Sequence, residues 1–107
     1  MGKNRIGRIG DFKGTGMRRI EVEGHAILLI HMNNAFYAIQ GLCSHKNGDL
    51  SKGTLEGFVV RCPVHGSEFD IRTGEVVKNV KLPLIGKAKN LQAYDVSLED
   101  GEIYIDV

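Results

Sequence analysis

The residues best suited to chemistry in this chain are two cysteines and two histidines, arranged as two matched pairs. One residue separates Cys43 from His45, two residues separate Cys62 from His65, and sixteen residues lie between His45 and Cys62. The chain has no other cysteine. Because thiolates and imidazoles both ligate transition metals, the two pairs predict a metal site with four protein ligands.

The order of the ligands indicates which metal centre they would hold. Zinc sites with two cysteines and two histidines usually pair cysteine with cysteine and histidine with histidine. Here each pair combines a cysteine with a histidine, which is typical of a [2Fe–2S] centre in which two histidines replace two cysteines on one iron. A structural zinc site and a disulfide between Cys43 and Cys62 are the alternatives.

The ligand types also predict how such a centre would behave. We expect Cys43 and Cys62 to hold one iron, and His45 and His65 to hold the other. Neutral imidazoles place less negative charge on their iron than thiolates do, so the reduction potential rises relative to an all-cysteine cluster. Each imidazole has a second nitrogen whose proton ferric iron makes easier to lose. Electron uptake should therefore couple to proton uptake at alkaline pH.

Length and composition place limits on the remaining interpretation. A chain of 107 residues predicts one domain spanning residues 1–107. The formal net charge of +1 gives no support for nucleic-acid binding. The longest apolar run, Ala26 to Ile30, is far shorter than the roughly 20 residues that a membrane helix needs. No signal-peptide pattern opens the chain, so we expect a cytoplasmic protein without a membrane partner.

The charges are unevenly spread along the chain. Basic residues gather before residue 20 and acidic residues near the end: Lys3, Arg5, Arg8, Lys13, Arg18 and Arg19 against Asp95, Glu99, Asp100, Glu102 and Asp106.

Short apolar runs separated by turn residues predict an all-β protein, either a barrel or a sandwich. The expected strands are residues 5–9, 17–22, 26–32, 36–40, 58–61, 69–71, 75–78, 94–98 and 103–105. Turns are expected at Glu23-Gly24, Asn33-Asn34, Thr73-Gly74 and Glu99-Asp100-Gly101, because glycine and asparagine tolerate a positive φ. The two metal-binding pairs fall between strands, where loops can point side chains at one shared point. His25 and His31 lie on an expected hairpin and are interpreted as exposed or packed strand residues.

At its metal-binding pairs the chain resembles the Rieske proteins, and specifically the small soluble Rieske-type ferredoxins, including those of archaea. The resemblance rests on Cys43-Ser44-His45, Cys62-Pro63-Val64-His65-Gly66-Ser67, the Phe69-Asp70 strand and the Thr73-Gly74 turn, and extends from about Ile27 onward. It implies one [2Fe–2S] cluster. It also implies a β-sandwich or barrel base with a small cluster-binding subdomain at residues 41–72, and partly exposed histidines that form the electron exit.

At other positions this chain differs from, or agrees with, the respiratory members of that family. Those proteins carry a disulfide where this chain has Gly48 and Val64, and a tyrosine that bonds a cysteine sulfur where this chain has Phe69. Ser67 matches the serine that bonds a bridging sulfide. Fewer donors to sulfur leave the more negative, reduced cluster less stable, so we expect a potential at the low end of the Rieske range.

Two further features bear on the surface around the cluster. Lys46 follows His45 directly, where the respiratory Rieske proteins have an apolar residue. It is either a solvated loop lysine or a nearby cation that favours the reduced cluster. Pro83 resembles the proline of a loop that covers the cluster on a third side. The segment around it, Lys78 to Asn90, contains four lysines and no acidic residue. This segment is either a solvated basic loop or a docking surface for an acidic redox partner.

These observations predict a one-electron carrier that catalyses no reaction alone. We expect a monomer that shuttles electrons between a reductase and an acceptor enzyme and binds no nucleic acid. A small Rieske subunit of an oxygenase or nitrite reductase complex is the alternative within electron transfer, and a structural zinc-binding module is the alternative from another class. The sequence does not identify the donor, the acceptor or the pathway.

Overall fold

A computed structural model describes residues 2–32, 35–44, 48–64, 66–78 and 88–107. Within these ranges the chain is almost entirely β. The strands are β1 (Lys3–Arg8), β2 (Gly16–Val22), β3 (His25–Met32), β4 (Ala35–Gln40), β5 (Thr54–Glu56), β6 (Val59–Arg61), β7 (Glu68–Asp70), β8 (Val76–Lys78), β9 (Ala93–Glu99) and β10 (Glu102–Asp106), with 3₁₀ turns η1 (Ile9–Asp11) and η2 (Leu50–Lys52). The expected all-β class is confirmed.

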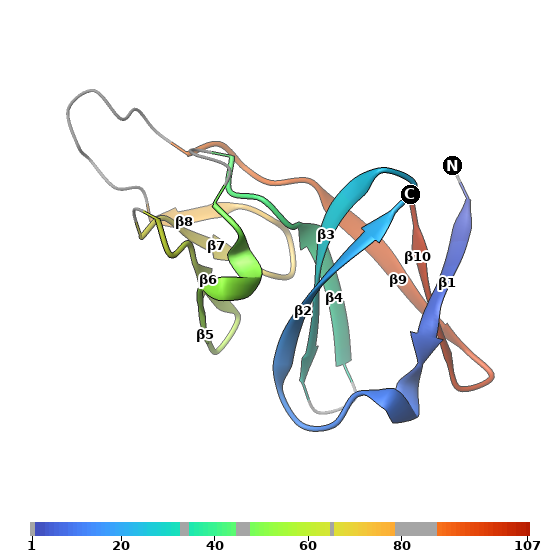
Figure 1. Cartoon of the computed structure of the whole chain (residues 1–107). Coiled ribbons are helices and arrows are strands. Elements are labelled where there is room, and N and C mark those ends of the chain that lie inside the picture. The colour runs from blue at the N-terminus through green and yellow to red at the C-terminus, as the bar shows by residue number, and fades with distance from the viewer. Residues whose placement is uncertain (1, 33–34, 45–47, 65, 79–87) are drawn as a thin grey trace.

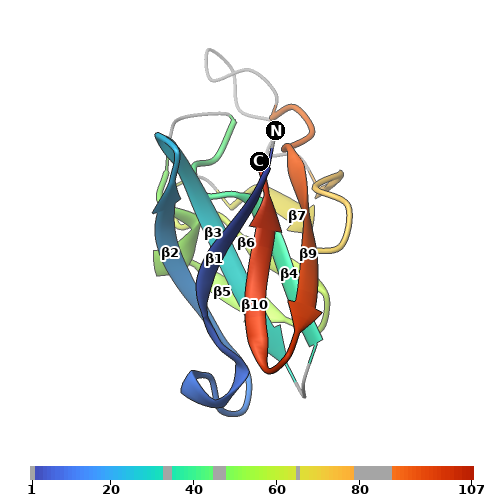
Figure 2. The same ribbon diagram turned by 90° about the vertical axis from the view of Figure 1, so that its right-hand side faces the viewer.

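The base of the molecule is a six-stranded antiparallel sheet that curls strongly (Figures 1 and 2). Its strand order is β1-β10-β9-β4-β3-β2, so the first and last strands of the chain are neighbours. The turn at Glu23-Gly24 has φ values of 47° and 83°, and the turn at Asp100-Gly101 has φ values of 52° and 78°. Positive φ at both central residues belongs to the tight hairpin turns that match strand twist. These two predicted hairpins are therefore confirmed.

A second, four-stranded sheet with the order β5-β6-β7-β8 lies at one end of the base (Figure 1). Its strands are short, three residues each. The loops that carry Cys43 and Cys62 belong to this end of the molecule. The base therefore positions the small sheet, and the small sheet positions the second cysteine.

Strand β3 joins the two parts because both of its faces are buried. Ile27 and Leu29 pack with Val22 and Ile105 inside the curled base, whereas Leu28 and Ile30 pack with residues of the small sheet. All four central side chains are 0% exposed. Burial on both faces explains why this strand reads as a continuous apolar run rather than as an alternating pattern.

The uneven charge along the chain is explained by the pairing of its two ends. Lys3 of β1 forms an ion pair with Glu99 of β9, and Arg5 forms one with Glu102 of β10. The basic start and the acidic end thus meet across the sheet, and part of the charge asymmetry is satisfied within the protein. These pairs are exposed, so each contributes little to stability.

The predicted strands agree with the structure except at one place and at their ends. Strand β5 was not expected, since Thr54-Leu55-Glu56 has a single apolar residue and lies between Gly53 and Gly57. The Asn33-Asn34 turn falls outside the described residues. In the described part of the chain, no helix has the length and apolar character needed to span a membrane.

Candidate metal centre

The first cysteine lies in a loop, residues 41–50, that follows β4 and is closed by its own main chain. We call it the first ligand loop. The Cys43 N–H donates to the Gly48 carbonyl (2.8 Å), and the Leu50 N–H donates to the Gly41 carbonyl (3.0 Å). Leu42 and Asp49 pair between these two bonds. The described residues 41–44 and 48–50 therefore pair with each other at the neck of the loop, where Cys43 lies with only 1% of its surface exposed.

The second cysteine lies in a tighter loop, residues 61–67, between β6 and β7. We call it the second ligand loop. The Cys62 N–H donates to the Ser67 carbonyl (2.8 Å), and the Gly66 N–H donates to the Cys62 carbonyl (3.1 Å). Gly66 has a φ of 82°, a left-handed conformation that glycine adopts without strain. Cys62 is 2% exposed, so both cysteines are buried at loop necks.

The two loops touch each other at Gly48. A Cβ built on Gly48 would lie 2.8 Å from the Cys62 sulfur and 2.6 Å from Cγ2 of Val64. It would also lie 3.4 Å from the Val64 Cβ, close to the separation that a disulfide requires. The structure thus brings together Gly48 and Val64, the positions expected to replace a disulfide. Val64 itself is 47% exposed, at the surface beside Cys62.

The two cysteines belong to one buried cluster of side chains. This cluster joins them to Leu28 and Ile30 of β3 and to Phe69 of β7. Cys43 and Cys62 form no disulfide with each other. Two buried thiols from separate loops, placed in one apolar cluster, are a donor set for a soft metal centre.

The hydroxyl of Ser67 tests whether the site suits an iron–sulfur group. Ser67 is 1% exposed, and its Oγ has no hydrogen-bond partner among the described residues. A buried hydroxyl without an acceptor is costly, so such a group usually has an explanation. A bridging sulfide would supply an acceptor, and the residues present therefore fit a [2Fe–2S] cluster. Phe69, two residues further along, is fully buried and carries no donor.

Four of the predicted site residues lie outside the described residues, namely His45, Lys46, His65 and Pro83. Within the ranges that the structure describes, no three His, Cys, Asp or Glu side chains gather into a metal site. The other two histidines have packing roles. The His31 Nδ1 donates to the Gly14 carbonyl (3.1 Å) and its ring lies 5.2 Å from that of Phe12, whereas the His25 ring lies 6.2 Å from that of Tyr94.

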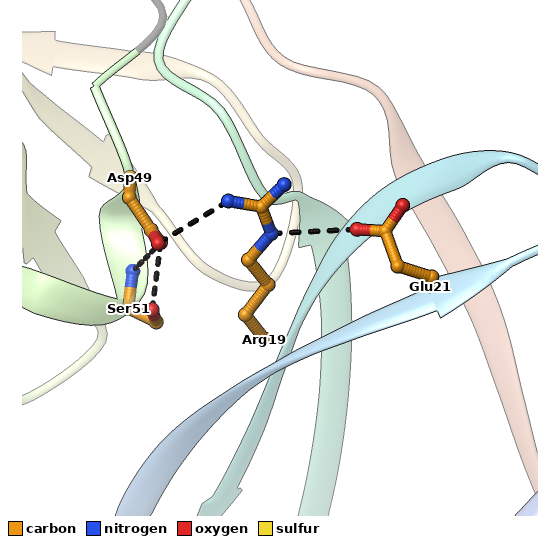
Figure 3. A network of polar contacts seen from close by, with 4 residues as sticks. All are labelled: Arg19, Glu21, Asp49 and Ser51. Atoms are coloured by element: carbon orange, nitrogen blue, oxygen red, sulfur yellow. Dashed lines mark hydrogen bonds and ion pairs between the residues drawn. The ribbon is translucent and has the colours of Figure 1, made fainter.

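One polar group next to the first ligand loop was not expected from the sequence. Arg19 of β2 forms an ion pair with Asp49 across thirty residues of chain (Figure 3). The pKa of the Asp49 carboxyl is held below its ordinary value. Hydrogen bonds from Ser51 are the main cause, and the Arg19 guanidinium is a further cause. No spacing rule links residues so far apart, and only the packing of η2 against β2 brings them together.

Known proteins resemble this chain over most of its length. The family model described as the Rieske [2Fe-2S] domain matches residues 3–94. The 3-phenylpropionate/cinnamic acid dioxygenase ferredoxin subunit of Photorhabdus laumondii is 39% identical over 86% of this chain and 82% of its own length. Ferredoxin CarAc of Metapseudomonas resinovorans is 31% identical over 89% of this chain and 84% of its own length.

Solved structures agree with these sequence matches. The ferredoxin of carbazole 1,9a-dioxygenase from Nocardioides aromaticivorans aligns with a TM-score of 0.83 and 27% identity, over 98% of this chain and 97% of its own. A chain from a complex of reduced oxygenase and oxidized ferredoxin in carbazole 1,9a-dioxygenase aligns with a TM-score of 0.78 and 28% identity, over 96% of this chain and all of its own. Together with the two matched cysteine loops, these findings show that the chain belongs to the Rieske [2Fe–2S] domain family, whose ferredoxin members carry one such cluster.

Proposed function

We propose that this protein is the ferredoxin component of an oxygenase system and passes single electrons from a reductase to a dioxygenase. The observation that carries the proposal is the pair of buried cysteines brought together in one cluster by two closed loops. The relatives named above as ferredoxin components of dioxygenase systems support the choice of partner. The chain itself is an electron carrier and not the catalyst.

We assign the cluster ligands to Cys43 and Cys62 on one iron and to His45 and His65 on the other. The bound cluster supplies one-electron chemistry. The chain's own residues would exclude water from the cysteine-bound side of the cluster, since both cysteines are buried. The Ser67 hydroxyl would donate a hydrogen bond to a cluster sulfide, and Phe69 would fill the core without adding a second donor. The small number of hydrogen-bond donors near the cluster sulfurs supports a reduction potential at the low end of the Rieske range.

The same proposal covers the organisation of the molecule and its surroundings. The chain forms one Rieske domain over residues 1–107, with a cluster-binding subdomain at residues 41–72 carried on the curled base. It acts in the cytoplasm as a monomer and meets its partners transiently. Lys46, Pro83 and the basic segment around Pro83 would border the cluster and contribute to docking of an acidic partner.

Metal analysis with spectroscopy tests the ligand assignment directly. We expect two iron atoms and two acid-labile sulfides per chain, with an electron paramagnetic resonance signal that appears on reduction. One zinc and no sulfide would overturn the proposal in favour of a structural zinc module. Replacing Cys43, His45, Cys62 or His65 by alanine should abolish the signal, whereas the matched control His25→Gln should keep it.

Electron transfer is tested with partner proteins. The reduced protein should be reoxidised rapidly by a dioxygenase component that holds its own Rieske centre, and slowly by the dioxygenase after that centre is removed. The second candidate is the small subunit of a nitrite reductase, the alternative expected from the sequence. A solved structure described as a nitrite reductase small subunit aligns with a TM-score of 0.73 and 17% identity, and this similarity shows the fold alone. A preference for a nitrite reductase as electron acceptor would favour that candidate.

A further inference from the structure

Arg19 connects the base sheet to the first ligand loop. Its Nη1 donates to Oδ2 of Asp49 at 3.3 Å, and its Nε donates to Oε2 of Glu21 at 3.3 Å (Figure 3). Arg19 and Glu21 both belong to β2, whereas Asp49 belongs to the loop. The Arg19 guanidinium therefore contacts one carboxylate of the base sheet and one carboxylate of the first ligand loop.

The Asp49 carboxylate is fixed from the other side by Ser51. The Ser51 N–H and Oγ–H both donate to Oδ1 of Asp49, at 3.0 and 2.6 Å. Ser51 thus occupies one carboxylate oxygen and Arg19 occupies the other. The side chain of Asp49 is only 20% exposed, so solvent screens this pair less than it screens a typical surface ion pair.

The main chain around Asp49 is part of the neck that holds Cys43. Asp49 pairs with Leu42, and the residue before it, Gly48, accepts the hydrogen bond from the Cys43 N–H. The residue after it, Leu50, is fully buried in the core shared with β3. The loop's own hydrogen bonds join its two legs to each other. Leu50 anchors the foot of the loop to the base, and Arg19 adds a polar anchor one residue away.

We propose that Arg19 is a positioning residue for the cluster: through Asp49 it fixes the neck of the first ligand loop to the base sheet and so fixes the position of Cys43. The inference rests on the proposed ligand role of Cys43. The effect of Arg19 passes through the Asp49 carboxylate and the main chain of residues 48–50.

Hydrogen–deuterium exchange on the cluster-loaded protein tests the proposal without relying on activity. Arg19→Gln and Asp49→Asn should each raise the exchange rate of a peptide covering residues 41–50 by about two- to five-fold, the change expected for losing a partly exposed ion pair. The double variant should exchange no faster than the faster single variant, since both substitutions remove one interaction. Arg19→Lys, which keeps the cation, should restore most of the protection.

The matched control is Glu21→Gln. It removes the other partner of the Arg19 guanidinium, but Glu21 has no main-chain link to the loop. Exchange of residues 41–50 should stay at the wild-type rate in this variant. An equal rise in Glu21→Gln, or no rise in Arg19→Gln, would overturn the proposal.

The double variant also distinguishes an effect of Arg19 on the position of the first ligand loop from a direct effect of its charge on the cluster. It loses one cation and one anion, so their direct effects on the reduction potential largely cancel. We expect Arg19→Gln, Asp49→Asn and the double variant all to broaden the electron paramagnetic resonance signal, because each loosens the neck that holds Cys43. Wild-type line width and exchange in the double variant would show that Arg19 acts through its charge alone. Iron and sulfide content, measured on the same samples, reports separately on the proposed cluster.

Discussion

Gly48 and Cys62 lie so close together that a Cβ on residue 48 would stand 2.8 Å from the Cys62 sulfur. Real side chains do not approach that closely, so a side chain at residue 48 would force Cys62 or Val64 to shift. The contact joins residues from two loops that are far apart in sequence, and it explains why the cysteine-bearing necks can meet in one buried cluster.

Gly48→Ala should therefore damage the metal centre. The new methyl group would push against both the Cys62 sulfur and Val64, and we expect a loss of about 1–3 kcal/mol in stability from overpacking, with lower cluster occupancy. Iron and sulfide analysis together with thermal unfolding would measure this. Gly10→Ala is the matched control, because a Cβ there would meet nothing within 4 Å. Full occupancy and an unchanged Tm in Gly48→Ala would contradict the prediction.

Ser67→Ala should lower the reduction potential of the cluster. The substitution removes a buried donor whose hydrogen bond would favour the more negative, reduced state. Protein-film voltammetry measures the shift, with Ser97→Ala on β9 as control. If the potential stayed constant, the Ser67 hydroxyl would not be bonded to the cluster.

Phe69→Tyr should raise the potential, because it adds a hydroxyl to a side chain packed in the same cluster as both cysteines. Phe69 is completely buried, so the added oxygen also carries a cost in stability unless it finds a partner. Voltammetry and thermal unfolding on one sample would distinguish these effects. A destabilised protein with no upward shift in potential would show that the hydroxyl does not reach a sulfur.

The reduction potential should be independent of pH near neutrality and fall with rising pH in the alkaline range. Histidine ligands that lose their second proton in the oxidised state must regain it on reduction, which makes electron uptake less favourable as protons become scarce. A redox titration from pH 6 to about 11 would show the change of slope. A potential without slope at every pH would exclude imidazole ligands that titrate.

Asp70→Asn should destabilise the protein at neutral pH. The carboxylate accepts hydrogen bonds from the Arg72 Nε (3.1 Å), Nη2 (2.9 Å) and N–H (2.8 Å), and the Arg72 side chain holds the pKa of Asp70 below its ordinary value. A lowered pKa in the folded state adds stability that is fully present above the unfolded pKa, about 3.9, and is lost as the pH falls through the folded pKa.

The expected loss is about 1 kcal/mol at pH 7, and the difference from wild type should shrink below about pH 4. Thermal unfolding followed by circular dichroism from pH 7 down to about pH 2 would measure this decrease, with the exposed Asp95→Asn on β9 as control. A difference in Tm that grew as the pH fell would contradict the assignment.

The sequence predicts the strands well because most of them alternate or form short apolar runs between turn residues. Glu23-Gly24 and Asp100-Gly101 mark their hairpins by backbone chemistry alone. Strand β5 leaves no pattern because Leu55 is its only apolar residue, and Leu55 pairs with Val60 across the small sheet. The prediction that the two cysteines are site residues also comes from the sequence, since ligand type and spacing are local properties.

What surrounds the cysteines is much harder to predict. The contact between Gly48 and Cys62 and the ion pair between Arg19 and Asp49 depend on how two sheets pack, not on any local spacing. The pairing of basic β1 with the acidic last hairpin is another such property. Charge counted along the chain does not indicate whether the basic and acidic segments meet, and only the strand order shows that they do.

The adjacency of β1 and β10 also dictates when the fold can be completed. Lys3 pairs with Asp106, a contact that spans almost the whole chain, so closing this edge of the base carries a large loop-closure entropy. During synthesis both ligand loops emerge from the ribosome before β9 and β10 do. The cysteines are therefore available while the base is unfinished, and β10, which is made after both of them, gives β1 its partner.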